Sequence, residues 1–258
     1  MNASTKVGYG DTILIFFDKK HKYVIRLSPN KDLHTDYGII RHDDLIGKKF
    51  GDTGKTHIGI EYKIIRPRLW QVVYYGFKRC TQVLYLKDIS YIISVSGITS
   101  GSRVVEAGIG SGFLTAFLAD RVRPDGIVYS YEIKENYIKT ARRNLRLAGL
   151  FDYVKIKLED ITKGIEEEDL DSVILDMPTP WKVVDHAFEK LRSGGTFVAF
   201  VPTVNQMEKT VFKLREAGFI EIEGQELIHR PYSISRDGSR PQSIIVGHTG
   251  YIIVGQKP

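Results

Sequence analysis

A short apolar segment that runs directly into closely spaced glycines restricts the fold of this chain more than any other feature. Arg103–Ala107 (RVVEA) is followed by Gly-Ile-Gly-Ser-Gly at residues 108–112, and an apolar helical pattern covers Phe113–Val122. Alternate glycines permit a tight turn and let the backbone approach a ligand closely. A buried strand that turns sharply into a helix is typical of a parallel α/β sheet, in which ligands bind at the carboxyl ends of the strands.

The alternation of strand and helix patterns continues to the end of the chain. Further strands are predicted at Gly126–Glu132, Tyr153–Leu158, Ser172–Asp176 and Thr196–Val201, and helices at Glu135–Leu147, after Trp181 and at Gln206–Ala217. The last two strands, near Ile220–Leu227 and Ser243–Val254, are joined by a polar, Arg-rich loop, which predicts an antiparallel pair. We therefore expect an α/β fold over residues 101–258, with a mostly parallel sheet and helices on both of its faces.

Residues 1–66 follow a different pattern of short β segments. Thr12–Phe17 and Tyr23–Leu27 flank Asp-Lys-Lys-His at residues 18–21, which predicts a hairpin turn. Further β segments lie around Tyr37–Ile40 and His57–Ile65. Their spacing of roughly ten residues predicts a small all-β domain, an antiparallel barrel or sheet.

Residues 67–100 connect these two regions. Asp88 is a candidate N-cap for a short helix with apolar residues at positions 89, 92 and 93, and Gly97 is a candidate helix stop. The sequence thus predicts three parts: a small β domain (1–66), a connector (67–100) and an α/β domain (101–258).

The positive charge of the chain is concentrated near its N-terminus. The net charge is +6, and residues 1–100 hold 16 Lys and Arg against 9 Asp and Glu, while the remainder is nearly neutral. A basic module beside a neutral one suggests a polyanion that is held by one part and processed by the other, although a solvated basic surface without a partner stays open. The chain has no apolar run of about 18 residues and no signal-peptide pattern at its start, so we expect no membrane span. The single cysteine, Cys80, excludes a disulfide within the chain and fits a reducing cytoplasm.

Acidic residues accompany the glycine turn at positions that suit a nucleoside. Glu132 ends the next strand, 20 residues after Gly112, where a carboxylate can accept hydrogen bonds from both ribose hydroxyls. Asp160 follows the third strand, where it can accept from an adenine amino group. Glu106 precedes a G-x-G-x-G spacing, in contrast to the G-x-G-x-x-G of NAD-binding turns, and together these features favour S-adenosylmethionine as the cofactor. The chain resembles the seven-stranded, Rossmann-like class I methyltransferases, and the predicted cofactor-binding residues of the turn are Glu106, Gly108, Gly110, Ser111 and Gly112.

A second motif, Asp-Met-Pro-Thr-Pro-Trp at residues 176–181, ends the fourth strand beside the expected methyl group. Two prolines stiffen this loop. Trp181 offers a flat face on which a base can stack, and Asp176 places a carboxylate at the reaction centre. A rigid structural turn, with Trp181 in the core and Asp176 capping a helix, is the alternative interpretation.

The order of these two motifs resembles the tRNA (adenine-N1)-methyltransferase family, the TrmI-like and Trm61-like enzymes, which modify adenine in the T-loop. The likeness extends to Thr-Gln-Val-Leu-Tyr-Leu-Lys-Asp at residues 81–88, to an Arg-rich loop between Arg230-Pro231 and Arg240-Pro241, and to His-Thr-Gly-Tyr at residues 248–251. It spans nearly the whole chain. Leu86 stands where the family commonly has proline, and Ile109 where it commonly has threonine.

The resemblance implies an S-adenosylmethionine-dependent enzyme that methylates N1 of one T-loop adenine, or of two neighbouring ones, and that forms a homotetramer without a metal ion. Asp176 would accept a hydrogen bond from the amino group of the target adenine and stabilise the positive charge that develops on the ring. The remaining expected roles are catalysis for Tyr85, cofactor contacts for Gln82 and Asp176, and tRNA contacts for Trp181, Arg230, Arg236, Arg240 and His248.

Two other functions remain open at this point. One is a class I methyltransferase with a different acceptor, such as a protein or isoaspartyl carboxyl group. The other is a non-catalytic tRNA-binding subunit of a heteromeric methyltransferase. The aromatic D-x-P-x-P-W loop argues against the first, and the intact glycine turn and Asp176 argue against the second.

Overall fold

The structure is a computed structural model that describes residues 5–258, and these residues form two compact units. The first unit contains the N-terminal part of the chain up to Arg79 together with residues 142–151, and the second contains residues 80–141 and 152–258. The helix α4 (Glu135–Ala148) begins in the second unit and ends in the first. The three-part division into residues 1–66, 67–100 and 101–258 stays a prediction.

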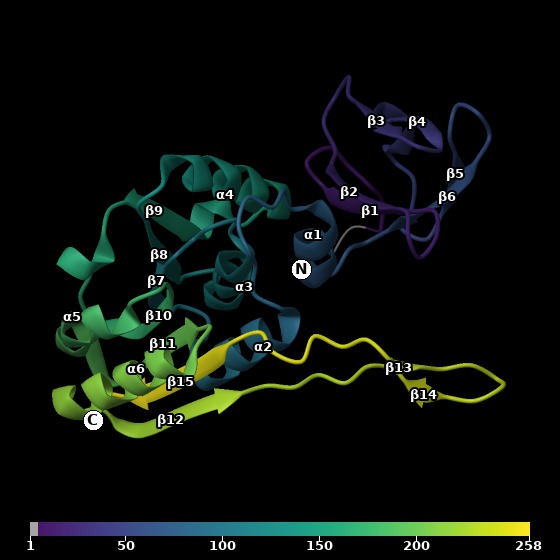
Figure 1. Cartoon of the computed structure of the whole chain (residues 1–258). Coiled ribbons are helices and arrows are strands. Elements are labelled where there is room, and N and C mark those ends of the chain that lie inside the picture. Colours follow the sequence, from purple (N-terminus) through teal and green to yellow (C-terminus); the bar gives the residue numbers. More distant parts are fainter. Residues whose placement is uncertain (1–4) are drawn as a thin grey trace. The chain divides into compact units, whose positions relative to one another are not determined.

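The first unit is built on a small antiparallel sheet in the order β2-β1-β6-β5 (Figure 1). Its strands are β1 (Thr12–Phe16), β2 (Lys22–Arg26), β5 (Thr53–Lys55) and β6 (Glu61–Ile65), and a separate hairpin pairs β3 (Asp32–Thr35) with β4 (Gly38–Arg41). The short helices η1 (Asp43–Leu45) and α1 (Leu69–Gly76) complete this part of the chain. A core of alternating inward residues, among them Ile13, Ile15, Tyr62 and Ile64, fills the unit. The expected small β-rich N-terminal region is confirmed.

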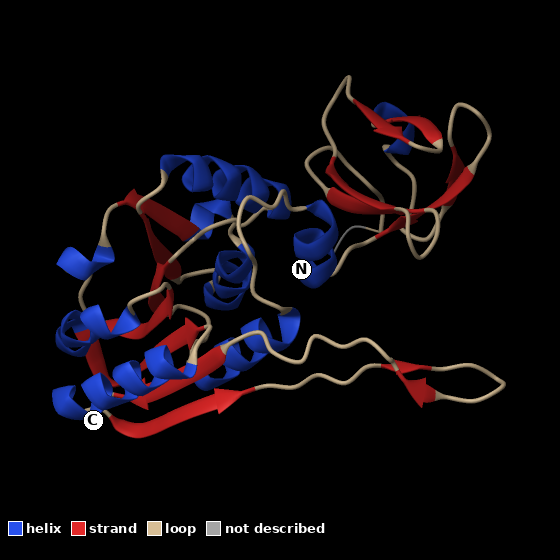
Figure 2. Ribbon diagram, in the orientation of Figure 1, coloured by secondary structure: helices blue, strands red, loops and turns tan. Residues whose placement is uncertain are grey.

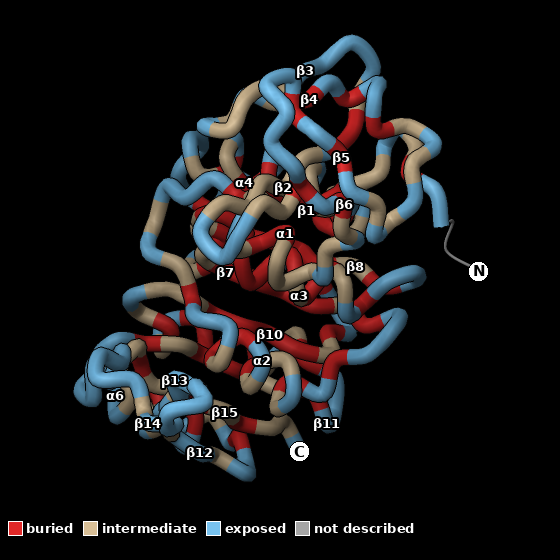
Figure 3. The backbone as a smooth tube through the Cα atoms, turned by 90° about the vertical axis from the view of Figure 1, so that its right-hand side faces the viewer, coloured by how far each residue is buried: buried red, intermediate tan, exposed pale blue. Residues whose placement is uncertain are grey.

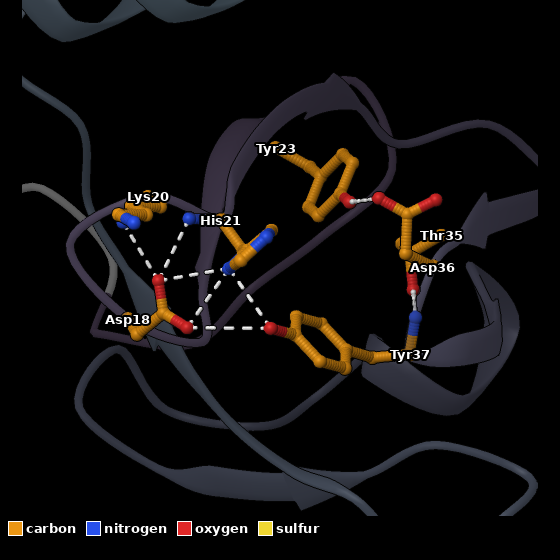
Figure 4. A network of polar contacts seen from close by, with 7 residues as sticks. All are labelled: Asp18, Lys20, His21, Tyr23, Thr35, Asp36 and Tyr37. Carbon is orange, nitrogen blue, oxygen red and sulfur yellow. Dashed lines mark hydrogen bonds and ion pairs between the residues drawn. The ribbon is translucent and has the colours of Figure 1, made fainter.

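The turn between β1 and β2 is organised by the side chain of Asp18 (Figure 4). Its carboxylate accepts hydrogen bonds from the backbone N–H groups of Lys20 (2.7 Å) and His21 (2.9 Å), which is the way an Asp side chain stabilises a tight turn. The His21 ring Nδ1 lies 2.9 Å from the same carboxylate and 2.9 Å from the Tyr37 hydroxyl. Hydrogen bonding to His21 lowers the pKa of Asp18 to about 2. The predicted hairpin turn at residues 18–21 is therefore confirmed.

The end of α4 is capped by strands of the same unit. Thr12 Oγ1 donates to the carbonyl of Leu147 (2.6 Å), and Arg26 Nη1 donates to the carbonyl of Arg146 (2.5 Å). The last carbonyls of a helix have no partner within the helix, so such contacts stabilise its terminus. They explain why residues 142–151 belong with the β-rich N-terminal segment.

The second unit contains a seven-stranded sheet in the order β12-β15-β11-β10-β7-β8-β9 (Figure 2). The strands β11, β10, β7, β8 and β9 run parallel, and β15 pairs antiparallel with β11 and β12. The bounds are β7 (Arg103–Ala107), β8 (Ile127–Glu132), β9 (Val154–Leu158), β10 (Leu170–Asp176), β11 (Leu191–Val201), β12 (Ile220–Glu226) and β15 (Tyr251–Gln256). The predicted Rossmann-like sheet with an antiparallel terminal pair is confirmed.

Helices pack against both faces of this sheet. The helices are α2 (Leu86–Val95), α3 (Phe113–Val122), α5 (Val184–Lys190) and α6 (Val204–Ala217). Alternate residues of each strand face opposite sides: Val105 lies in the core that includes Val184 of α5 and Leu214 of α6, whereas Glu106 faces Thr115 of α3. Because both faces are covered, the central strands are buried along their length, as Figure 3 shows for β10.

Two expectations about element ends are wrong. Asp88 does not cap α2, because the helix begins one turn earlier with Tyr85 as its N-cap; Asp88 is buried in the first turn and pairs with Lys87 at 2.7 Å. The last strand begins at Tyr251 and not at Ser243, since in the described part of the chain residues 243–250 have no neighbouring strand that could pair with them.

Residues 227–250, which we name the arm, leave β12 and return into β15 as a long projection (Figure 1). A short hairpin of β13 (Tyr232–Ser233) and β14 (Arg240–Pro241) forms its outer part. The arm exposes apolar side chains: Ile234 is 84% exposed and Ile244 is 90% exposed. Large apolar side chains that gather on a surface indicate contact with another molecule. Across the described residues, no helix is both long and apolar enough to span a bilayer.

Candidate active site

A cavity of about 390 Å³ opens in the second unit where the parallel strands β7, β8 and β10 end. Five separate segments line it: Thr81–Leu84, the glycine turn after β7, the end of β8 with the residues after it, the segment 159–161 after β9, and the end of β10. This is the edge at which ligands bind in sheets of this kind.

The glycine turn lies against the neighbouring elements too closely for side chains. A Cβ atom on Gly108 (φ +91°) would lie 2.0 Å from the carbonyl oxygen of Asp176, and one on Gly110 (φ +48°) would lie 2.8 Å from Thr81 Oγ1. Gly112, with φ +78°, is the N-cap of α3 and does not line the cavity. Both the left-handed backbone and the contacts therefore require glycine at the first two positions.

Glu132 ends β8 with its carboxylate at the cavity. One oxygen accepts from the backbone N–H of Gly110 (3.3 Å), and the other accepts from the N–H groups of Ile133 (2.9 Å) and Lys134 (3.0 Å). These bonds hold the carboxylate in one orientation beside the glycine turn. Glu132 is 8% exposed and lines the cavity, where its carboxylate can accept hydrogen bonds from the hydroxyl groups of a ligand.

Asp160 lies on the next wall of the cavity, as the N-cap of the short helix η3 (Ile161–Lys163). Its Oδ1 accepts from the backbone N–H (3.0 Å) and the hydroxyl (2.7 Å) of Thr162. The hydrogen bonds to Thr162 lower the pKa of Asp160, so its carboxylate is ionised at neutral pH. Oδ2 takes no hydrogen bond from the described part of the chain.

Asp176 is the last residue of β10 and brings a half-buried carboxylate to the cavity. Within residues 5–258, no group donates a hydrogen bond to this carboxylate. Burial raises the pKa of Asp176 to about 7, because the charged form loses solvation that no neighbouring donor replaces. A carboxyl group that titrates near neutral pH inside a cavity is suited to accept a hydrogen bond or a proton from a ligand.

Glu106 is placed differently from the expectation that it contacts the cofactor. It is 1% exposed, lies on β7 beneath the turn, and accepts hydrogen bonds from Thr115 Oγ1 (3.0 Å) and Ser130 Oγ (2.9 Å). It is not among the residues that line the cavity. Burial raises the pKa of Glu106 to about 7, although the two hydroxyl donors oppose the effect.

The connector closes one side of the cavity. Gln82 lines it from the connector, and Ser111 lines it from the glycine turn. The Ser111 hydroxyl accepts from the backbone N–H of Cys80 (3.0 Å) and lies 3.0 Å from Thr81 Oγ1, so the connector is fixed to the turn.

Tyr85 and the residues expected to bind the tRNA lie outside the cavity lining, whereas Asp176 belongs to it. Tyr85 follows the lining segment directly, as the N-cap of α2, and is 40% exposed. Trp181 lies in the short helix η4 (Pro180–Lys182) after β10, with Lys209 Nζ 5.3 Å from the centre of its ring system. His248 precedes β15, where its ring nitrogens face Glu226 (2.5 Å) and the carbonyl of Pro202 (3.0 Å).

The arm carries the three arginines expected to bind RNA phosphates. Arg230, Arg236 and Arg240 are all exposed and lie apart from the cavity lining. The structure therefore groups the predicted cofactor residues other than Glu106 and Gly112 at one cavity, and it places the three predicted RNA-binding arginines on the arm.

Sequence reasoning missed several residues of the cavity wall. Tyr131, Lys134 and Tyr137 line the cavity but belong to no motif, and Met177 lines it from an unassigned position of the D-x-P-x-P-W motif. Tyr131 and Lys134 lie within two residues of Glu132, and Met177 follows Asp176. Closeness in sequence to a predicted site residue was therefore the only signal that could have indicated them. Within the described ranges, no group of three or more His, Cys, Asp or Glu residues could hold a metal ion; the absence of a metal stays a prediction.

Comparisons with known proteins give two family matches. A family described as "tRNA methyltransferase complex GCD14 subunit" matches residues 62–239, and one described as "TrmI-like N-terminal" matches residues 7–52. A relative from Methanocaldococcus jannaschii, named tRNA (adenine(57)-N(1)/adenine(58)-N(1))-methyltransferase TrmI, is 34% identical over 95% of this chain and 94% of its own length.

Two solved structures are similar over nearly the whole chain. A SAM-dependent O-methyltransferase from Thermotoga maritima superposes with a TM-score of 0.86 at 36% identity, covering 98% of this chain and 95% of that one. The tRNA (m1A58) methyltransferase TrmI from Aquifex aeolicus superposes with a TM-score of 0.78 at 30% identity, covering 98% of both chains.

Proposed function

This chain belongs to the tRNA methyltransferase family of the GCD14 and TrmI proteins, and we propose from that premise that it methylates N1 of adenine in the T-loop of tRNA. The proposed target is adenine 58, with adenine 57 as a second target, as in the name of the M. jannaschii relative. The observation that carries the proposal is the Asp176 carboxylate, which enters the cavity beside the glycine turn without a hydrogen-bond donor from the described residues.

The cofactor is S-adenosylmethionine, and the residues of the cavity fit it. We assign the ribose hydroxyls to Glu132, the adenine amino group to the open Oδ2 of Asp160, and a further contact to Gln82. Gly108 and Gly110 permit the close approach of the ligand to the turn, with Ser111 holding the connector in place. When bound, this group supplies a sulphonium methyl as the electrophile.

The chemical task of the protein is to align the attacking nitrogen and to stabilise charge. Asp176 accepts a hydrogen bond from the exocyclic amino group of the target adenine, which raises the electron density at N1. As the ring becomes cationic, the carboxylate stabilises the charge and can take a proton from the amino group. Only the ionised carboxylate can stabilise the cationic ring and take the proton, so activity rises with pH as Asp176 loses its own proton near its pKa of about 7.

The target adenine is stacked in the folded T-loop and must leave the stack to reach the cavity. We assign the surface that receives it to Trp181 and Tyr85, which flank the cavity on the loop after β10 and on the connector. We also assign a tRNA contact to His248, whose ring is held by Glu226 and by the carbonyl of Pro202.

The first unit is the proposed docking surface for the rest of the tRNA. With Arg142, Arg143 and Arg146 of α4 it contains 18 Lys and Arg against 8 Asp and Glu, whereas the second unit contains 19 against 23. All three arginines are exposed. A basic unit of this kind binds a phosphate backbone without reading its sequence. Arg230, Arg236 and Arg240 of the arm would add phosphate contacts.

The arm also supports the proposed homotetramer. Exposure of the Ile234 and Ile244 side chains to water is unfavourable in an isolated subunit. Contact with a second copy of the chain would bury them. The free cysteine, Cys80, supports a cytoplasmic location, because reducing compartments keep thiols unpaired.

Methylation of a defined tRNA transcript tests the proposal. An unmodified transcript is incubated with the purified single chain and isotopically labelled S-adenosylmethionine, and its nucleosides are separated by mass. The expected product is labelled N1-methyladenosine, which disappears when adenines 57 and 58 of the transcript are both replaced. Label on another nucleoside or on protein would favour a different acceptor, and no transfer by the chain alone would favour a non-catalytic subunit.

A further inference from the structure

We propose that Lys87 and Thr249 are positioning residues for methyl transfer, because their hydrogen bond fixes the substrate side of the connector to the segment that leads into the last strand of the sheet. The inference deepens the proposed function and rests on it. The connector segment 81–88 lines the cavity with its first four residues and carries Tyr85 directly after them.

The first end of this segment is fixed to the cofactor side of the cavity. The backbone N–H groups of Cys80 (3.0 Å) and Thr81 (3.3 Å) both donate to the hydroxyl of Ser111 in the glycine turn. Any shift of this end therefore disturbs the turn on which the cofactor lies.

The other end is fixed to a different part of the sheet. Lys87 Nζ donates to Thr249 Oγ1 at 2.6 Å and pairs with Asp88 Oδ1 at 2.7 Å. Asp88 is 0% exposed, and its Oδ2 has no hydrogen-bond partner among the described residues. A buried carboxylate in that state requires a nearby cation, so Asp88 holds the Lys87 ammonium in place.

Thr249 is itself held by its neighbours. The ring of His248 lies with Nδ1 2.5 Å from Glu226 Oε1 of β12 and Nε2 3.0 Å from the carbonyl oxygen of Pro202 after β11. Both partners are acceptors, so only a ring that carries protons on both nitrogens satisfies both contacts. The segment before β15 is thus joined to β12 and to the residue that follows β11, and the Lys87 hydrogen bond attaches the connector to this segment.

The two attachments predict two separable effects. Gln82 and Tyr85 lie between them, so the Ser111 attachment governs the cofactor wall, and the Thr249 attachment governs where Tyr85 lies. A displacement of about 1 Å in a group that orients the substrate lowers the rate of the chemical step, whereas the cofactor contacts on the other side of the cavity are unaffected. Without the Thr249 hydrogen bond, kcat for tRNA is therefore expected to fall while cofactor affinity stays unchanged.

Substitutions at Thr249 test this most sharply, since they leave the Lys87–Asp88 pair intact. Thr249→Val removes the hydroxyl at nearly constant volume, and Thr249→Ser retains the hydroxyl as the matched control. We expect Thr249→Val to lower kcat about tenfold, with the KM for tRNA and the dissociation constant for S-adenosylmethionine each within about twofold of wild type. Thr249→Ser is expected to retain most of the wild-type kcat.

Lys87→Met is the second variant. Its circular dichroism spectrum and its affinity for S-adenosylmethionine show whether the chain remains folded. A folded Lys87→Met protein should lose kcat to at least the extent of Thr249→Val. Wild-type kcat in Thr249→Val, or an equal loss in Thr249→Ser, would overturn the inference, as would weakened cofactor binding in Thr249→Val. These comparisons require a wild-type chain that methylates tRNA. If the wild-type chain does not methylate tRNA, the proposed function is overturned, and not the role of Lys87 and Thr249.

Discussion

At the scale of single residues, the proposed methyl transfer depends on the Asp176 carboxylate at the end of β10. We expect Asp176→Asn to lower the rate of methyl transfer by about 100-fold or more, because an amide cannot supply the negative charge that stabilises a cationic ring. The substitution preserves shape, so the dissociation constant for S-adenosylmethionine, measured by calorimetry, should change little. Near-normal turnover by the variant would remove Asp176 from the mechanism.

Glu106 leads to a prediction about stability and pH. Its pKa in the folded chain is about 7, above the value of roughly 4.3 for an unfolded chain. The folded state therefore binds the proton more tightly, and the stability that this group contributes is present at low pH and is lost as pH rises toward and through 7. Glu106→Gln cannot ionise, so the melting temperature of the variant should fall less between pH 5 and pH 8 than that of the wild type.

The matched control for this measurement is Glu135→Gln, because the Glu135 carboxylate is exposed and pairs with a lysine, Lys139 at 2.9 Å, and not with a histidine. The pH dependence of its melting temperature should follow the wild type, whatever its absolute stability. Parallel curves for wild type and Glu106→Gln would show that Glu106 does not titrate in this interval.

At the scale of elements, the turn between β7 and α3 is the most sensitive part of the cavity. Gly108→Ala would place a methyl group 2.0 Å from the backbone carbonyl of Asp176, a clash that no side-chain rotation relieves. We expect the variant to lose cofactor binding by at least about tenfold or to unfold, since the strain falls on two adjacent strands. Gly8→Ala is the control, because its new methyl group would lie 3.8 Å from its nearest neighbour. Wild-type cofactor affinity in Gly108→Ala would contradict the geometry of the turn.

The elements themselves were largely predictable from sequence, because the periodicity of buried residues is local information. The helix Phe113–Val122 has the predicted bounds, and the terminal strands form the expected antiparallel pair. Element ends were less predictable: Asp88 looks like a cap, yet it is buried beside Lys87, whose partner Thr249 lies 162 residues away along the chain. Long-range contacts of this kind leave no spacing in the sequence.

The candidate site shows the same limit. Motif spacing predicted Glu132, Asp160 and Asp176, since each follows a parallel strand and such strands end at one edge. It did not place Glu106, which shares the motif but faces Thr115 of α3, because the face on which a strand residue lies depends on register. Residues such as Tyr137 line the cavity only through the packing of α4 after β8.

At the scale of the whole molecule, the uneven charge distribution predicts salt-sensitive RNA binding. The affinity for tRNA should fall at least about tenfold between 50 and 200 mM salt, because each phosphate that the protein neutralises releases a counterion. Replacing both Arg142 and Arg143 with alanine should reduce the slope of log affinity against log salt by about 1 for each phosphate that these arginines neutralise. Lys213→Ala, on α6 of the second unit, is the control and should leave the slope unchanged. A flat salt response of the wild type would exclude the first unit as a phosphate-binding surface.

The exposed apolar residues of the arm predict how the subunits assemble. Ile234→Asp combined with Ile244→Asp should reduce the mass measured by light scattering from that of a tetramer to that of a smaller species, because charges would enter a buried contact. Phe212→Asp, at an exposed apolar residue of α6, is the control and should leave the mass unchanged. A wild-type chain that is monomeric at all concentrations would contradict the proposed assembly.

The most direct test of the central claim is a crystal structure of this chain with S-adenosylmethionine bound. We expect the Glu132 carboxylate to accept hydrogen bonds from the ribose hydroxyls and the methyl group to point toward the Asp176 carboxylate across the open side of the cavity. A cofactor bound elsewhere, or an Asp176 side chain turned away from the methyl group into packed core, would contradict that claim.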